Sequence, residues 1–571
     1  MNPRGGLRAI CARAKPHASF SALSYADTGG MSGLGAREET LASDAGLDLY
    51  LARQFLPWRR EGERVLIATA DTSAANLAWL RAAYDEPHIV SVAHRDLQKE
   101  IANRFRDRLS DDAVFSLWRK MPSLSARRTV THKQAVVFVA IGIAIAVACR
   151  LWPFSSVQIL VAAMSVGFAV SATFRAALAL LSSRRREVCA PPSDESALPS
   201  YTILVPLYRE ARILPELARA LLALDYPRDR LDIKFVVEDD DEETCAAAQA
   251  LTAQGPFEVL HVPYSLPRTK PKACNYALRF ARGDYLVIYD AEDRPETDQL
   301  RKAVGRFREA SPETACLQAR LAIYNADDGW LTRMFALDYF VWFRALLPGL
   351  DRLGVPMPLG GTSNHFRTAA LRIAGGWDPF NVTEDADLGI RLALLGYRVS
   401  MLDSTTFEEA PARLGVWLKQ RSRWLKGYMQ TWLVHAREPV ALTGRVGLRG
   451  AATMQLFLVG AIWSALFNPV LWLILIVSCA CSHPNAERQI VDMLARIAGL
   501  GLLSANVMLT GVAISGTRRK WALAPYGICF VFYWALISIA AYRGLWQLIF
   551  KPFYWEKTPH GHTRPAGVLD L

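Results

Sequence analysis

Long apolar runs on both sides of a polar stretch constrain the fold of this chain more than any other feature. Two uncharged runs lie within residues 134–180, where Arg150 separates them, and three more lie within residues 451–546. Each is long enough, or nearly so, for a helix that crosses the hydrocarbon core of a membrane. The sequence therefore predicts two transmembrane helices before the polar stretch and about three to four transmembrane or re-entrant helices after it.

Basic residues next to these runs predict the topology. The cluster Arg184–Arg186 follows the second run and sets the polar stretch on the cytoplasmic side of the membrane. The loop 516–520 is also basic, and a simple count of spans then leaves the tail 547–571 outside. The tail carries cations of its own, which favours a re-entrant hairpin for the last apolar run instead. Both topologies stay open.

The net charge of +12 indicates contact with an anionic partner, and the bilayer and nucleotide phosphates are the expected ones. Nucleic acid is not expected, because the chain shows neither zinc-finger spacing nor an aromatic RNA-binding consensus.

The N-terminal part of the chain divides into a leader and a small module. Residues 1–44 are rich in Gly, Ala, Ser and Arg without periodicity, which predicts a disordered leader. Residues 45–120 alternate strand and helix patterns, as in "RVLIATAD" and "RDLQKEIANRFRDRL". This module resembles the second half of the N-terminal domain of type II secretion ATPases. Some members of that family bind cyclic di-GMP through an Arg-Leu-Gly repeat, which is absent here, so a docking or structural role is favoured.

The polar stretch, residues 198–435, contains one sequence pattern twice. In "DIKFVVEDDDEET" and "GDYLVIYDAEDRPETDQL" an apolar strand ends in a burst of acids. Alternating strands and helices with acids at the carboxyl ends of the strands predict an open α/β sheet that binds its ligand at those ends. Asp290 and Glu292 are one residue apart, a spacing that suits Mg²⁺ or Mn²⁺ on a diphosphate. Such a pair alone is weak evidence, since acids also cap helices.

Further motifs follow in a fixed order. They are "PRTKPKACNYAL", the glycine pair of "PLGGTSNHFR", the Thr-Glu-Asp of "NVTEDADLGI", and "QRSRW". The ordered set resembles the processive family-2 glycosyltransferases, the inverting membrane polysaccharide synthases that include cellulose, curdlan and bacterial exopolysaccharide glucan synthases. The resemblance implies a GT-A domain, with a Rossmann-like mixed sheet, embedded between transmembrane helices.

The resemblance also implies an activity and its residues. The expected reaction moves a sugar, glucose being favoured, from a UDP-sugar to a growing polysaccharide, with export across the bacterial inner membrane. Asp385 matches the general base that takes the proton of the acceptor hydroxyl. Asp290, Glu292 and Asp293 match the metal site. The remaining matches are, for UDP, Pro206, Tyr208, Glu210, Glu238, Asp239, Asp240, Lys270 and Lys272, and, for acceptor and diphosphate, Glu384, Gln420, Arg421, Arg423 and Trp424.

Spacing supports the last group independently. In a helix, Gln420, Arg423 and Trp424 fall at i, i+3 and i+4 and therefore share one face. We expect that face to close the active site while Lys419 and Lys426 point toward lipid headgroups.

Other functions remain open at this stage. A non-processive transferase acting on a lipid carrier would share every motif, and so would a docking or phage-receptor protein with an inert transferase domain. A transporter is poorly supported, because the chain has no Walker A motif. Export proteins and cyclic di-GMP stay open as partners.

Overall fold

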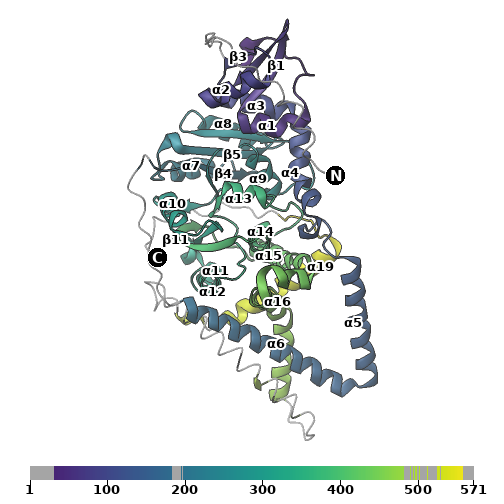
Figure 1. The fold of residues 1–571 in the computed structure, drawn as a ribbon. Helices are drawn as coiled ribbons and strands as arrows, with labels where there is room; N and C mark the ends of the chain where they lie inside the picture. Colours follow the sequence, from purple (N-terminus) through teal and green to yellow (C-terminus); the bar gives the residue numbers. More distant parts are fainter. Residues whose placement is uncertain are drawn as a thin grey trace. The chain divides into compact units, whose positions relative to one another are not determined.

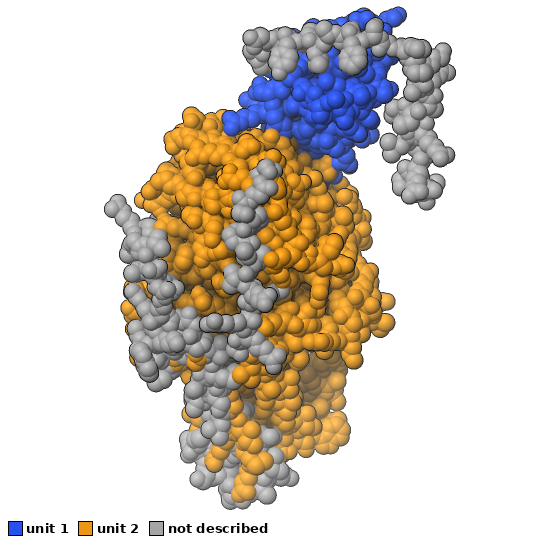
Figure 2. Space-filling view, turned by 60° about the vertical axis from the view of Figure 1, so that its left-hand side comes forward, with its two compact units in different colours: residues 1–113 blue, residues 114–571 orange. Residues whose placement is uncertain are grey.

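The computed structural model describes residues 31–182, 195, 197–480, 524–527 and 529–556, with a few isolated positions between 489 and 511. The chain divides into two compact units, residues 1–113 and residues 114–571 (Figure 2). The predictions for the start of the leader, for the basic loop 516–520, for most of the membrane segment 481–523 and for the tail beyond residue 556 lie outside the described residues.

The first unit is built on a three-stranded sheet in the order β1-β2-β3. β1 and β2 are antiparallel, and β2 and β3 are parallel. The Ser73 side chain caps helix α2 by accepting a hydrogen bond from the Asn76 N–H. The elements are α1 (Leu47–Arg53), β1 (Phe55–Glu61), β2 (Arg64–Thr69), α2 (Ala74–Ala83), β3 (His88–Ser91) and α3 (His94–Arg104).

Two features of this unit differ from the sequence prediction. Strand β1 was not predicted, because Pro57 interrupts its pattern, and the register of β1 on β2 shifts there. Residues 31–44 were assigned to a disordered leader but lie against β1. The Glu38 N–H donates to the Trp58 carbonyl at 2.8 Å, and the Trp58 indole N–H donates to the Gly35 carbonyl at 3.1 Å.

Three described helices are long and apolar enough to cross a membrane, namely His132–Leu151, Pro153–Ser182 and Pro439–Ile474. The first two are α5 and α6 and coincide with the predicted spans in residues 134–180. Thr131 starts α5 with a capping box that it forms with Gln134. The third span is part of α16 (Pro439–Ala480), which begins before the predicted residue 451. α4 (Arg106–Lys120) precedes α5.

The second unit contains an eight-stranded mixed sheet in the order β6-β5-β4-β7-β10-β9-β11-β8 (Figure 1). β4 is parallel to both β5 and β7, whereas β10 is antiparallel to β7 and β9. The predicted α/β fold with a mixed sheet is confirmed. The strands are β4 (Tyr201–Leu207), β5 (Leu231–Glu238), β6 (Phe257–Val262), β7 (Tyr285–Ile288), β8 (Arg294–Pro295), β9 (Thr314–Ile323), β10 (Asn364–Arg367) and β11 (Arg398–Glu408).

The apolar strands form the core because helices cover them. Ile203, Phe235 and Val287 belong to one buried cluster that also includes side chains of α7 and α8. Parallel strands that are covered in this way read as nearly continuous apolar runs, which is the pattern in the sequence. The helices between the strands are α7 (Leu214–Leu222), α8 (Glu242–Leu251), α9 (Lys270–Leu278), α10 (Gln299–Glu309), α11 (Trp330–Val341), α12 (Leu347–Leu353), α13 (Thr368–Ile373) and α14 (Glu384–Leu394).

Helix α15 (Leu414–His435) carries "QRSRW" and packs against α16 and α19 (Phe530–Phe550). The approach of α19 is close, since a Cβ on Gly544 would lie 2.8 Å from the Ser422 carbonyl oxygen. The chain after α19 then returns to α15. The Lys426 ammonium donates to the Tyr554 carbonyl at 2.7 Å, and the Gln430 amide donates to the Pro552 carbonyl at 2.9 Å. Residues 552 and 554 therefore contact the helix that carries "QRSRW".

Candidate active site

Asp385 lies in the first turn of α14, where the helix dipole favours a negative charge. The Ala386 N–H donates to Asp385 Oδ1 at 2.9 Å. The chain that leads into α14 is also held, because the Thr383 N–H donates to Asn381 Oδ1 at 3.0 Å. Burial raises the pKa of Asp385 above its usual value, while Lys270 and Arg423 oppose the shift. A carboxylate so placed is suited to accept a proton.

Acids from two separate motifs interact electrostatically with Arg423. Burial lowers the pKa of its guanidinium, and the charges of Glu384, Asp385, Asp290 and Glu292 act in the opposite direction. Burial and the Asp385 charge together raise the pKa of Glu384 to about 8. The structure thus assembles the predicted base, two predicted metal ligands and the predicted diphosphate arginine.

Lys270 and the glycine pair complete the centre of the site. The Lys270 ammonium forms an ion pair with Asp290 and donates to the Gly361 carbonyl at 3.3 Å. Gly361 has φ +98°, and a Cβ there would lie 3.2 Å from Asp385 Oδ2. Only glycine combines that backbone conformation with so close an approach. The glycine pair of "PLGGTSNHFR" thus admits backbone next to the predicted base.

Of the other two predicted metal ligands, Asp293 is more buried than Asp290. Asp293 is 1% exposed and accepts hydrogen bonds from the Asp290 N–H at 2.7 Å and from the Thr362 hydroxyl. Its Oδ1 is buried without a hydrogen-bond partner in the described part of the chain. Burial and the Asp290 charge raise the pKa of Glu292 to about 8. A cluster of buried acids that raise one another's pKa is one that a cation would stabilise.

The acids of this cluster supply the kind of ligand that a divalent ion needs. Hard carboxylate oxygens and an orphaned buried oxygen on Asp293 fit Mg²⁺ or Mn²⁺. Among the described residues, however, no three His, Cys, Asp or Glu side chains already converge as ligands. Asp293 holds the Asp290 backbone, so Asp290 and Glu292 are the better candidates for direct contact.

The predicted UDP-binding residues fall into two groups. Glu238 and Lys272 form a buried ion pair at 2.8 Å, and burial raises the pKa of Glu238 against the effect of Lys272. This pair is largely satisfied within the protein. Glu210 likewise turns inward, since its carboxylate accepts the Tyr208 N–H at 3.2 Å. Pro206 is half-buried within β4.

The second group is more exposed and includes a residue that the sequence reasoning missed. The Arg268 guanidinium bonds Asp240 and the Tyr208 hydroxyl, each at 2.5 Å, and lies over the Tyr264 ring at 5.0 Å. Asp239 lies 3.7 Å from the His261 ring nitrogen. Arg268 lies in the quoted stretch "PRTKPKACNYAL", from which only Lys270 and Lys272 were predicted to bind UDP. Its place just before these lysines in the sequence is the signal that could have identified it.

The side chains of α15 that were assigned to acceptor and diphosphate differ in their surroundings. Trp424 packs 5.9 Å from the Phe335 ring, and Gln420 is buried with its Oε1 unpartnered among the described atoms. Arg421 was assigned to the acceptor and diphosphate group, but it forms an ion pair with Asp338 at 2.6 Å and donates to the Tyr533 hydroxyl at 2.9 Å. It joins α15 to α11 and α19, because it lies one position away from the face of Gln420 and Arg423.

Lys426 also differs from its prediction. It was expected to face lipid headgroups, yet it is fully buried and bonds the chain after α19. Burial lowers the pKa of Lys426 to about 8. Lys419 on the same helix is half exposed and lies 3.8 Å from Glu556.

A second missed residue is Trp555. The Arg423 guanidinium lies 4.6 Å from the centre of the Trp555 indole, a cation–π distance. The two residues are far apart in the sequence, so no local pattern indicates the contact. The Trp555 ring thereby limits the positions that the Arg423 guanidinium can take.

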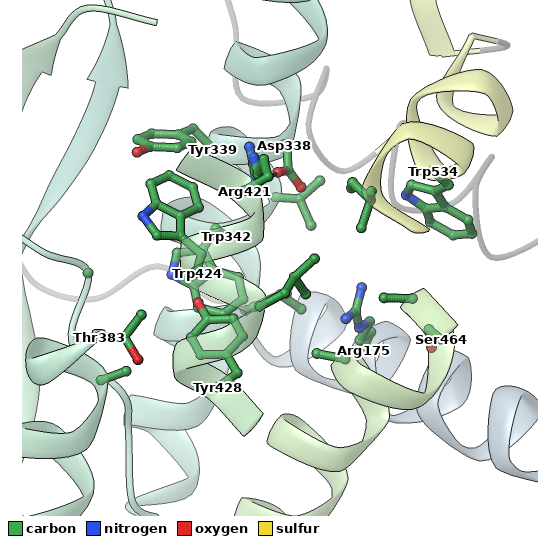
Figure 3. A pocket seen from close by; sticks show the side chains of 18 of the residues that line it. Arg175, Asp338, Tyr339, Trp342, Thr383, Arg421, Trp424, Tyr428, Ser464 and Trp534 are labelled. Atoms are coloured by element: carbon green, nitrogen blue, oxygen red, sulfur yellow. Dashed lines mark ion pairs between the residues drawn. The ribbon is translucent and has the colours of Figure 1, made fainter. Parts of the chain in front are cut away.

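A cavity of about 200 Å³ extends from Asp385 to the membrane helices. Figure 3 shows Trp424 and Tyr428 on one side of it and Trp534 and Arg175 on the other. Side chains of α6, α16 and α19 line its far end. Its lining includes Phe168, Ser171, Arg175, Asp338, Tyr339, Trp342, Gly361, Thr383, Asp385, Arg421, Trp424, Tyr428, Ser464, Asn468, Trp534 and Ile537.

Comparison with known proteins finds similarity in the second unit. The family "Glycosyltransferase like family 2" matches residues 199–427. The β-monoglucosyldiacylglycerol synthase of Synechocystis sp. is 27% identical over 402 residues, which is 65% of this chain and 78% of that protein. The probable glycosyltransferase YdaM of Bacillus subtilis is 26% identical over 234 residues, 40% of this chain and 55% of that protein.

Plant enzymes and a solved structure also match. Probable glucomannan 4-beta-mannosyltransferase 10 of Arabidopsis thaliana is 28% identical over 247 residues, 40% of this chain and 43% of that protein. Apart from the Synechocystis enzyme, the chain spans about half the length of these curated relatives. A mannosyltransferase from Pyrobaculum calidifontis, solved in complex with GDP-Man and Mn²⁺, is 20% identical, covers 68% of this chain and 99% of its own, and has a TM-score of 0.47.

Proposed function

We propose that residues 199–427, which match the family "Glycosyltransferase like family 2", form a GT-A domain that transfers glucose from UDP-glucose to a growing polysaccharide at the inner membrane of a bacterium. The observation that carries the proposal is the cavity that joins Asp385 to α6, α16 and α19. An acceptor that enters between these helices presents its hydroxyl to a carboxylate that the catalytic domain supplies.

The chemistry follows from the positions of the charged groups. Asp385 takes the proton of the acceptor hydroxyl as that oxygen attacks the anomeric carbon from the face opposite the leaving diphosphate. The configuration at that carbon is thereby inverted, and no covalent sugar–enzyme intermediate is required. Arg423 and Lys270 face the same acids and are the cations that meet the charge of the departing UDP.

Asp290 and Glu292 would hold the divalent cation, with Asp293 fixing the Asp290 backbone. A bound Mg²⁺ or Mn²⁺ neutralises charge on the diphosphate. Lys270 already pairs with Asp290 and supplies one positive charge at the same place.

The first prediction concerns the metal. Asp290→Ala should weaken Mn²⁺-dependent binding of UDP by roughly tenfold or more, because a metal contact with a phosphate oxygen contributes several kcal/mol. Isothermal titration of UDP into the purified protein, with Mn²⁺ and with EDTA, measures the effect. Asp229→Ala, which removes an exposed carboxylate elsewhere in the domain, is the matched control. Equal UDP affinity in the variant and the wild type would move the metal site to other residues.

The lining of the cavity favours a sugar chain as acceptor. Trp342, Trp424 and Tyr428 offer aromatic faces for pyranose rings, while Arg175 and Asn468 offer hydrogen bonds at the end near the membrane helices. An acyl chain in the same place would leave these polar groups unpaired, which is costly. These aromatic faces and polar groups suit a hydroxyl-rich occupant, whereas Leu346, Leu359 and Ile537 in the same lining are apolar.

A lipid acceptor is the second candidate function. The similarity to the β-monoglucosyldiacylglycerol synthase of Synechocystis, which spans most of that protein, favours it. The second prediction separates the two candidates by product size. Membranes that contain the chain, incubated with radiolabelled UDP-glucose, should yield a water-soluble polymer that lengthens with time. A single labelled lipid that carries one added sugar would replace the polysaccharide proposal with the lipid one.

A further inference from the structure

The catalytic loop, defined as residues 376–383, leads directly to Glu384 and Asp385 and is held from several sides. Helix α9 holds its start, where the Asn275 amide donates to the Trp377 carbonyl at 2.8 Å and the Trp377 N–H donates to Asn275 Oδ1 at 2.9 Å. Helix α15 holds its end, where the Val382 N–H donates to Gln430 Oε1 at 3.1 Å. The loop that presents Asp385 therefore has its position set by contacts from outside itself.

A further set of contacts comes from the segment between α4 and α5, which no catalytic motif includes. Asp378, in the middle of the catalytic loop, is fully buried. Its carboxylate accepts hydrogen bonds from the Ser125 hydroxyl at 3.3 Å and from the Ala126 N–H. It also accepts the Phe380 N–H at 3.1 Å. One carboxylate thus ties the catalytic loop to residues 125–126.

Helix α15 fixes the same segment from its end. The Arg437 guanidinium, just after α15, donates to the carbonyls of Ser123 at 2.9 Å and Ser125 at 3.1 Å, and also to that of Arg128. Several main-chain acceptors on one guanidinium hold a turn in a single conformation. These hydrogen bonds therefore hold the backbone of residues 123–128 in place.

Aromatic packing adds a second connection. Phe380 lies 6.0 Å from the Phe115 ring of α4 and 5.5 Å from the Phe553 ring. The Arg127 guanidinium lies 4.9 Å from the Phe115 ring and 5.9 Å from the Phe380 ring. Phe553 precedes by two residues Trp555, the ring over which Arg423 lies. The cluster therefore links the neighbourhoods of both catalytic side chains.

We propose that residues 114–131, the juxtamembrane segment, position the catalytic loop, with Asp378 and Phe380 as the positioning residues through which Arg127 and the 125–126 backbone act. The inference rests on the proposed role of Asp385. A base must lie within hydrogen-bond reach of the hydroxyl that it deprotonates, and a displacement of about 1 Å can cost a hundredfold in rate. The segment touches no donor-binding residue described above, so it acts on the chemical step and leaves donor affinity unchanged.

Arg127→Ala tests the proposal, and Arg128→Ala is its matched control. Both side chains are exposed and carry the same charge, but the Arg128 guanidinium lies over none of the aromatic rings that the structure describes. Arg127→Ala should lower kcat roughly tenfold with KM for the UDP-sugar within about twofold of wild type. Arg127→Lys, which keeps a cation over the rings, should restore most of kcat. Arg128→Ala should match the wild type.

A second variant and a second measurement do not depend on turnover. Asp378→Asn replaces one carboxylate oxygen by an NH₂ group that cannot accept the Ala126 N–H. In this variant and in Arg127→Ala, the amides of residues 376–383 should exchange with deuterium faster while UDP binds with unchanged stoichiometry. Unchanged exchange in both variants, or an unchanged kcat per UDP-binding site, would overturn the proposal. If the amides exchanged faster in both variants but the wild type transferred no sugar, the positioning proposal would stand. The proposed function would then be rejected.

Discussion

Asp385→Asn should abolish sugar transfer, with a fall of about 10²- to 10⁴-fold in turnover, the range that a general base contributes. The substitution keeps the shape of the side chain and its hydrogen bond from the Ala386 N–H, but an amide cannot take the acceptor proton. UDP should still bind, because the predicted diphosphate cations, Arg423 and Lys270, are unchanged. UDP release and product formation, measured on the same preparation as UDP binding, separate the two effects.

The control for this variant is Asp403→Asn. Asp403 lies on β11 and is about half exposed, and its partner is Arg320 outside the site. It should transfer sugar at the wild-type rate. If Asp385→Asn kept more than about a tenth of the wild-type turnover, Asp385 would not be the base.

Arg423→Ala should have the second largest effect. The charges of Glu384, Asp385, Asp290 and Glu292 all act on its guanidinium, which lies over the Trp555 ring. Removing a group that stabilises developing charge typically costs about 10²- to 10³-fold in kcat, and we expect that range here. Arg423→Lys should recover only part of the loss, because an ammonium lacks the planar fork that bonds a diphosphate with two N–H groups.

Lys419→Ala is the matched control for Arg423→Ala. It removes a cation from the same helix, but the Lys419 side chain is half exposed and points toward Glu556. Its turnover should equal that of the wild type. Equal losses in the two variants would mean that the general charge of α15 matters, and would remove Arg423 from the diphosphate site.

Local patterns located the acidic motifs at strand ends and "QRSRW" on a helix. The acids that follow β5 and β7 belong to strands that lie on either side of β4 in one sheet. The i, i+3, i+4 spacing placed Arg423 on the side of α15 that faces the acids. The same rule shows why the role assigned to Arg421 does not match its place in the structure, since one position of offset turns its side chain toward Asp338.

Contacts between distant residues could not be predicted in this way. The pairing of Lys270 with Asp290, the stacking of Arg423 on Trp555 and the bonds of Asp378 with residues 125–126 each join segments that only the fold brings together. Burial of Lys426 was missed for the same reason, because the chain that covers it follows α19. Strand β1 was missed for a local reason. Pro57 cannot donate a hydrogen bond to a neighbouring strand, so a proline in the pattern argues against a strand.

Release of UDP from a panel of UDP-sugars, by membranes that contain either the wild-type chain or Asp385→Asn, tests the central claim most directly. The proposed function predicts that the wild type releases UDP from UDP-glucose together with an equal amount of sugar in a polymeric product, and that Asp385→Asn binds UDP but forms neither. If the wild type bound UDP yet released none from any UDP-sugar, the transferase assignment of this site would be contradicted.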